Sequence, residues 1–221
     1  MKILRCELLI MTILVVSLSS CIQDKPRILI IGDSISIGYT PFVRENLANK
    51  ANVFHNPGNA QHTGTGLEKI DEWIGNEKWD VIQFNWGLWD LCYRHPDSKV
   101  QGNRDKEKGE ITYIIDEYTS NLDSIVTMLQ TKTDAKLIFV TTTYVPENEA
   151  GRFQNDVIRY NDAAKNIMKN HSIIVNDIYE QSIPIHEKFG NGLDDVHYSN
   201  QGYEELSKLV TGFLKTEIKS N

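Results

Sequence analysis

Short apolar runs alternate with amphipathic segments along most of this chain, and this alternation restricts the possible folds more than any other feature of the sequence. The apolar runs have the length of buried strands and lie at 28–31, 51–56, 79–87, 135–143 and 172–177. The segments between and after them space apolar side chains as helices do, at 39–50, 65–75, 112–129, 153–170 and 203–215. We therefore predict an α/β fold: three layers, doubly wound, with a mostly parallel five-stranded sheet.

The overall composition is typical of a single globular domain. The chain has 221 residues, of which 40% are hydrophobic and 24% are charged. The formal net charge is −7, and the Lys and Arg residues form no cluster. An acidic chain without a basic patch is not expected to bind nucleic acid.

The N-terminal segment has the pattern of a signal peptide. Lys2 and Arg5 precede an apolar run at 8–18, which is too short to span a bilayer comfortably. The run ends in Leu-Ser-Ser-Cys, which resembles a bacterial lipobox whose cysteine, here Cys21, is lipidated after cleavage. An ordinary secretory signal is the alternative.

These features predict the domain organisation and the location of the protein. We expect a lipoprotein signal peptide at 1–20, a tether at 21–26 and one globular domain at 27–221. A lipid on Cys21 would hold the domain on a membrane of the bacterial cell envelope. Cys92 would then be the only other cysteine of the mature chain, which leaves no partner for an internal disulfide.

Polar residues follow the first predicted strand at the point where it ends. The chain continues there as Gly32-Asp33-Ser34. Ligands bind at the carboxyl ends of the strands in open parallel sheets, so Ser34 could be a nucleophile. The alternative is that Asp33 and Ser34 only cap the next helix.

A carboxylate and an imidazole follow the last predicted strand. Asp194 and His197 are three residues apart, a spacing that would bring their side chains together in a helical turn. A carboxylate so placed orients the imidazole and leaves its other nitrogen free to act as a base. Ser34, Asp194 and His197 therefore predict a hydrolase triad. No Gly-x-Ser-x-Gly motif occurs, which disfavours the α/β-hydrolase fold.

These segments resemble the signature blocks of the SGNH (GDSL-type) hydrolases, which are serine esterases with a flavodoxin-like sheet. The first block is similar to 32–36 and the last to 194–197, and the resemblance extends from about 28 to 213. It implies that Ser34 attacks an ester, that His197 takes its proton and that Asp194 orients His197. We expect no cofactor, and the histidines and acids show no metal-ligand spacing.

The middle blocks depart from the family pattern, which affects the predicted oxyanion hole. The third block normally reads Gly-x-Asn-Asp, whereas this chain has Trp89 in the place of Asn. The indole N–H of Trp89 or the amide of Asn85 could replace the missing donor. Trp89 could instead only pack, or stack on a sugar. For the backbone N–H of the second block we predict Gly58, with Gln61 as the alternative register.

Two further regions have open roles. The charged segment 94–110 is either a solvated loop or a lid over the substrate. Arg152 and Asn161 either reach the site or lie on a solvated helix face.

The predicted activity is hydrolysis of O-acyl esters, above all O-acetyl esters of carbohydrate, as the resemblance implies. Lipase or thioesterase activity is the enzymatic alternative, although the polar segment 94–110 does not indicate an apolar trough for a long acyl chain. The alternative from another class is a non-catalytic, carbohydrate-binding lipoprotein on the same fold. Trp89 favours that alternative, and the retained Ser34, Asp194 and His197 oppose it.

Overall fold

A computed structural model describes residues 25–218 of the chain. The predicted signal peptide, Cys21 and most of the tether lie outside the described residues. Within 25–218, none of the helices combines the length and the apolar character needed to cross a membrane.

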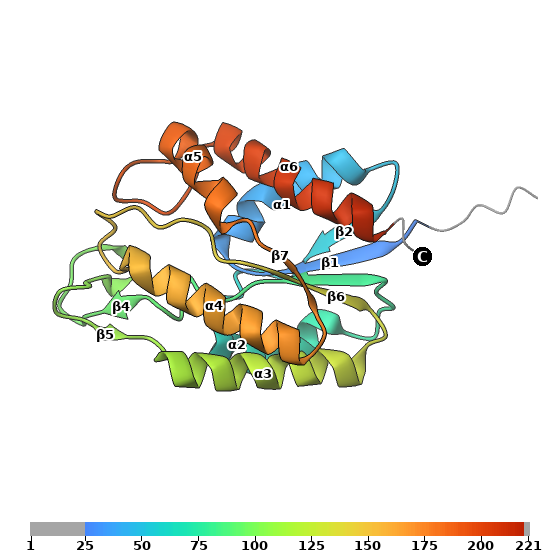
Figure 1. The fold of residues 1–221 in the computed structure, drawn as a ribbon, viewed down its shortest axis with the longest axis horizontal. Coiled ribbons are helices and arrows are strands. Elements are labelled where there is room, and N and C mark those ends of the chain that lie inside the picture. The colour runs from blue at the N-terminus through green and yellow to red at the C-terminus, as the bar shows by residue number, and fades with distance from the viewer. Residues whose placement is uncertain (1–24, 219–221) are drawn as a thin grey trace, which may run out of the picture.

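The centre of the molecule is a sheet of five parallel strands (Figure 1). Their spatial order is β2-β1-β3-β6-β7. The bounds are β1 (Arg27–Ile31), β2 (Asn52–His55), β3 (Val81–Phe84), β6 (Lys136–Val140) and β7 (Ile174–Asn176). The predicted fold class is confirmed. The strand order reverses between β1 and β3, and a crevice for a ligand forms at such a switch point, beyond the carboxyl ends of the strands.

Helices cover both faces of the sheet and complete the three layers. α1, α5 and α6 pack together on one face, and α2, α3 and α4 on the other (Figure 1). The bounds are α1 (Ser34–Leu47), α2 (Thr63–Ile74), α3 (Ile115–Lys132), α4 (Gln154–Asn170), α5 (Tyr179–Phe189) and α6 (Asn200–Glu217). Because both faces are covered, most side chains of the three inner strands are buried, which explains why the strands are nearly continuous apolar runs.

Two helices differ from the prediction. α1 begins at Ser34 rather than near residue 39, because Asp33 caps it: its side chain accepts a hydrogen bond from the Ile35 N–H. Pro41 therefore lies inside the helix. α5 was not predicted; Pro184 lies within it, and proline is normally a sign against a helix interior.

The charged segment 94–110 folds into an extension at the end of the molecule where the strands of the sheet end (Figure 1). It contains the antiparallel pair β4 (Tyr93–Arg94) and β5 (Glu110–Ile111), with the short 3₁₀ helix η1 (Gln101–Asn103) between them. Backbone hydrogen bonds from Tyr93 and Lys106 to the carbonyls of Gly151 and Ala150 fix it to the loop before α4. The segment is therefore an ordered part of the domain.

Asp90, in the loop between β3 and β4, is a fully buried carboxyl that contacts the start of α2. Its Oδ1 accepts hydrogen bonds from the backbone N–H of Thr63, at 2.9 Å, and from the Thr63 hydroxyl, at 2.5 Å. Burial raises the pKa of Asp90 to about 7, although the bonds from Thr63 act to lower it. The folded state therefore holds a proton on Asp90 at a pH where the unfolded chain has lost it.

We expect Asp90→Asn to stabilise the protein more near pH 8 than near pH 5.5. The raised pKa means that the wild type loses stability as the pH rises from 3.8 towards 7, because the unfolded chain ionises Asp90 over this range while the folded state keeps it protonated. Asparagine keeps an acceptor for Thr63 and does not titrate. Thermal unfolding of both proteins at the two pH values measures the difference, with Asp97→Asn on the surface as control. An equal change in Tm at both pH values would contradict the prediction.

Candidate active site

Ser34 lies at the junction of β1 and α1, as the first residue of the helix. Asp33 caps the helix, so the side chain of Ser34 is free for another contact. The Ser34 Oγ is 2.9 Å from Nε2 of His197, which comes from the loop between α5 and α6. Residues 163 positions apart therefore meet at the carboxyl edge of the sheet, as the sequence predicted.

The carboxylate that contacts His197 belongs to Asp195 and not to the predicted Asp194. Asp195 Oδ1 lies 2.6 Å from His197 Nδ1 and also accepts a hydrogen bond from the His197 backbone N–H, at 3.0 Å. Asp194 is exposed to solvent. The prediction was wrong because residues 191–199 form a loop and not a helical turn, so a spacing of three does not bring the side chains together.

The environment keeps Asp195 ionised. Burial acts to raise its pKa, but the hydrogen bonds from the backbone and side chain of His197 outweigh burial and lower the pKa. An ionised carboxylate can only accept a hydrogen bond, so Nδ1 of His197 carries the proton. Nε2 is then left with a lone pair directed at the Ser34 hydroxyl.

His186 on α5 holds the loop that carries Asp195. Its Nε2 is 2.7 Å from the backbone carbonyl of Asp195, and its side chain is buried. Burial lowers the pKa of His186, which favours the neutral imidazole. His186 therefore positions the loop that carries Asp195, and it does not line the pocket.

A pocket of about 290 Å³ opens beside Ser34 and His197. Its wall contains Asn59, Asp195 and Val196, and the remaining residues come from the segment 88–104 and from position 152. The residues from these segments are Leu88, Trp89, Arg94, Gln101, Gly102, Arg104 and Arg152. The segment 94–110 is thus a wall of the pocket, which agrees with a contact to substrate rather than with a solvated loop.

Of the three residues predicted for the oxyanion hole, only Trp89 lines this pocket. The amide of Asn85 donates to the Val140 carbonyl at 2.7 Å and so joins the ends of β3 and β6. Gly58 lines a separate depression beside Arg44 and His55. The predictions for Asn85 and Gly58 are therefore corrected. The donor role of Trp89 stays a prediction.

The residue that the sequence analysis missed is Asn59. It lines the pocket with Ser34, and its Oδ1 accepts the backbone N–H of Gln61 at 2.8 Å. Gln61 has a φ of 51°, a left-handed conformation that favours glycine. The available signal for Asn59 was its position next to Gly58 in the second block, where the family pattern indicates a backbone donor and gives no sign of a side-chain one.

Neither Arg152 nor Asn161 lies on a solvated helix face. Arg152 is buried and lines the pocket, with its Nε donating to the Leu88 carbonyl at 2.6 Å. Asn161 is buried and exchanges two hydrogen bonds with the backbone of Thr142. Trp86 is also buried, stacked on Trp73, and serves the core.

Within residues 25–218, no group of three or more His, Cys, Asp and Glu side chains has the arrangement of a metal site. The groups in the pocket that can take part in a reaction are a serine hydroxyl, an imidazole, a carboxylate and several N–H donors.

Sheet order and strand-end residues together define the class of the SGNH-type hydrolases. The chain belongs to the GDSL-like lipase/acylhydrolase family, whose model matches residues 30–205. It is accordingly a carboxylic ester hydrolase. A search of curated proteins finds no match.

Solved structures share the fold. A lipase/acylhydrolase from Enterococcus faecalis has 21% identity and a TM-score of 0.68, over 87% of this chain and 96% of that one. An acetylxylan esterase from Geobacillus stearothermophilus has 20% identity and a TM-score of 0.66, over 87% and 94% of the two chains. A GDSL-like lipase from Bacteroides thetaiotaomicron has 16% identity and a TM-score of 0.62, over 88% of each chain.

Proposed function

We propose that this hydrolase removes short acyl groups, above all acetyl groups, from carbohydrate esters by a Ser34–His197–Asp195 triad. The observation that carries the proposal is the line of contacts from Ser34 Oγ through both nitrogens of His197 to Asp195, at the wall of a pocket. A non-catalytic carbohydrate-binding protein would not need this line of contacts.

In this mechanism the Ser34 hydroxyl attacks the ester carbonyl as Nε2 of His197 takes its proton. Asp195 stabilises the imidazolium that forms and holds its orientation. The imidazolium then protonates the leaving sugar hydroxyl, which departs and leaves an acyl group on Ser34. Water enters, His197 takes its proton, and the carboxylic acid is released as Ser34 is restored.

Two N–H groups near Ser34 are suited to hold the oxyanion of the tetrahedral intermediate. The Ser34 backbone N–H lies in the first turn of α1, where N–H groups lack helical partners and the helix dipole favours negative charge. The second is Nδ2 of Asn59, because Oδ1 of that side chain is already engaged with Gln61. An asparagine from the second block would then replace the one that the third block lacks.

We expect Asn59→Ala to lower kcat for an acetyl ester by about 10²-fold with little change in KM, because the lost donor acts on charge that develops only in the transition state. Steady-state kinetics with p-nitrophenyl acetate measure both constants. Asn85→Ala is the matched control: it should lower Tm, because it removes a bond between strands, with a smaller effect on kcat. A full kcat in Asn59→Ala would exclude the amide from the oxyanion hole.

The substrate class rests on two supports. The pocket is small and its lining mixes polar and apolar side chains without a long apolar trough, which suits a short acyl group on a sugar better than a fatty acyl chain. Two of the proteins with similar structures are acetylxylan esterases, at 14% and 20% identity. The anchor on Cys21 stays a prediction from the sequence.

The experiment is a screen for acetate release from acetylated polysaccharides, run beside p-nitrophenyl esters of increasing acyl length. We expect acetate release from at least one polysaccharide and a preference for the acetyl over the octanoyl ester. A preference for octanoate would favour the lipase alternative. Absence of hydrolysis of every ester, with folded protein, would overturn the proposal.

A further inference from the structure

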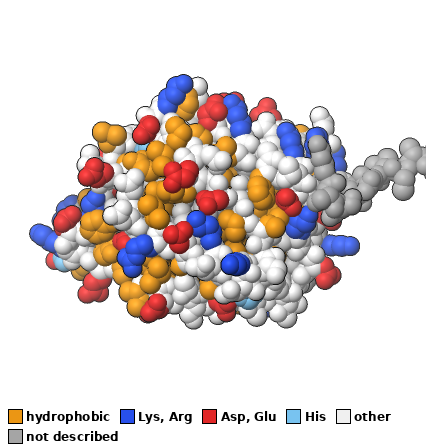
Figure 2. All heavy atoms as spheres, viewed as in Figure 1, with side chains coloured by type: hydrophobic (Ala, Val, Ile, Leu, Met, Phe, Trp, Pro, Cys, Tyr) orange, Lys and Arg blue, Asp and Glu red, His pale blue; other side chains and the backbone are white. Residues whose placement is uncertain are grey.

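Three arginines gather in the pocket beside Ser34, in a chain whose net charge is −7. They come from separate parts of the chain: Arg94 from β4, Arg104 from the residue after η1, and Arg152 from the loop before α4. On the face seen in Figure 2, by contrast, acidic and basic side chains are interspersed. Positive charge is therefore concentrated beside Ser34.

Arg104 and Arg152 share one carboxylate. Oε1 of Glu149, which is fully buried, accepts hydrogen bonds from Nη1 of both arginines. Arg152 is itself only 4% exposed, and its Nε is used by the Leu88 carbonyl. One carboxylate balances one of these two guanidiniums, so the group keeps one positive charge. These two ion pairs join the segment 94–110, through Arg104, to the loop before α4, which carries Glu149 and Arg152.

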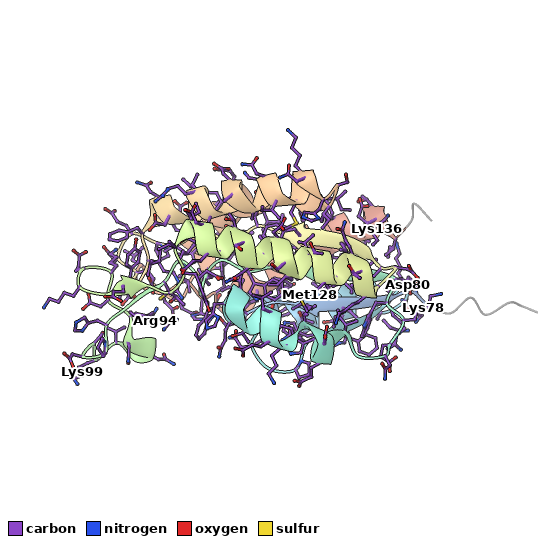
Figure 3. The ribbon with its side chains drawn as sticks, turned by 90° about the horizontal axis from the view of Figure 1, so that it is seen from below. Lys78, Asp80, Arg94, Lys99, Met128 and Lys136 are labelled. Atoms are coloured by element: carbon purple, nitrogen blue, oxygen red, sulfur yellow. The ribbon has the colours of Figure 1, made fainter. Side chains whose placement is uncertain are left out.

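Arg94 forms no ion pair with any residue of the described range 25–218. Its Nη1 donates to the Gly102 carbonyl, and its guanidinium lies over the ring of Trp89 at 4.8 Å. These contacts fix the orientation of the guanidinium. They do not compensate its positive charge, and they leave its other N–H groups able to donate to a ligand. Arg94 lies at the same end of the molecule as Lys99, which is further out (Figure 3).

Three arginines, Glu149 and Asp195 together give the pocket a net charge of one positive unit. Three arginines face Glu149 and Asp195, and Asp195 is engaged by His197. A neutral substrate that covered Arg94 would take a charged group out of water without a partner, which is unfavourable. A substrate with one negative charge would compensate it, and the planar fork of a guanidinium matches a carboxylate with two parallel hydrogen bonds.

We propose that the substrate carries a carboxylate close to its ester bond and that Arg94 binds it. This inference rests on the proposed function and narrows it from acetylated carbohydrate in general to an anionic ester. The carboxylate has two possible sources: the sugar, as in a uronic acid that bears the acetyl group, or the acyl group, as in the hemiester of a dicarboxylic acid.

Matched pairs of substrates distinguish the two sources. For the sugar side the pair is methyl tri-O-acetylglucuronoside as free acid and as methyl ester, assayed by acetate release. For the acyl side the pair is the mono-p-nitrophenyl ester of adipic acid and its methyl ester, assayed by p-nitrophenol. We expect the wild type to prefer the acid in one pair by about tenfold or more in kcat/KM, the scale of a hydrogen bond to a charged group. Added salt should reduce the preference.

Arg94→Gln should abolish that preference by lowering kcat/KM for the acid more than for its methyl ester. The ratio is taken within one protein, so a partly unfolded variant does not distort it. Lys99→Gln is the control, because it removes one positive charge from the same segment at a residue that does not line the pocket, and it should keep the wild-type ratio.

The outcomes separate the inference from the proposed function. Hydrolysis of acids and methyl esters at equal rates by the wild type would overturn the inference and leave the esterase proposal intact. An equal loss for both members of a pair in Arg94→Gln would overturn it too, because Arg94 would then act on the reaction rather than on the carboxylate. Absence of hydrolysis of any ester would overturn the proposed function itself.

Discussion

Ser34→Ala and His197→Ala should each lower kcat on acetyl esters by about 10³-fold or more, and the double variant should lose little beyond either single variant. Ser34 Oγ and His197 Nε2 are 2.9 Å apart, which allows the imidazole to take the proton of the hydroxyl. Without that proton transfer the hydroxyl is a poor nucleophile. Removal of either group disables the same step. Hydrolysis that remains should come from substrate binding and the oxyanion donors alone.

Steady-state kinetics with p-nitrophenyl acetate test this result, and a fluorophosphonate that labels active serines tests it independently. Ser34→Ala should not be labelled. Ser124→Ala and His171→Ala, on the surface of α3 and at the end of α4, are the matched controls and should keep the wild-type kcat. If the losses of the two single variants multiply in the double variant, the two residues act separately and the triad is wrong.

The strands of the sheet were predictable because each of the inner ones is buried on both faces. A strand such as β6 is apolar and buried at every position after Lys136, and such a continuous apolar run is visible in the sequence. α5 was not visible: few of its side chains are buried, and Pro184 interrupts its backbone hydrogen bonds. The β4–β5 extension was not visible either, because its order comes from hydrogen bonds to the distant loop before α4.

The candidate site was predictable to the extent that topology alone positions it. Ser34 follows β1 and His197 precedes α6, so both had to reach the same edge of the sheet. The oxyanion donors depend on individual side-chain directions, which strand order does not determine. Asn85 illustrates this: it lies at the right end of β3, but its amide is held by the Val140 carbonyl.

The orienting carboxylate shows the same limit at a finer scale, and its test has a large expected effect. Asp194 and Asp195 are adjacent in a loop, where neighbouring side chains point in different directions. Asp195 contacts His197 at 2.6 Å, whereas Asp194 is exposed. The spacing in the sequence favoured the first of the two, and the conformation of the loop selects the second.

We therefore expect Asp195→Asn to lower kcat by about 10³-fold or more, while Asp194→Asn stays within about twofold of the wild type. Asparagine at 195 has nearly the shape of the carboxylate, but its amide N–H₂ can donate to Nδ1. That contact would favour the tautomer that carries its proton on Nε2, the nitrogen that must accept the proton of Ser34. It would also remove the negative charge that stabilises the imidazolium.

The two variants make the same change in charge one residue apart, so any effect of net charge or of expression cancels between them. Kinetics on p-nitrophenyl acetate, with Tm measured for each variant, decide the matter. A severe loss in Asp194→Asn together with a mild one in Asp195→Asn would mean that the working enzyme pairs His197 with Asp194, and that the loop 191–199 changes conformation before the ester is attacked.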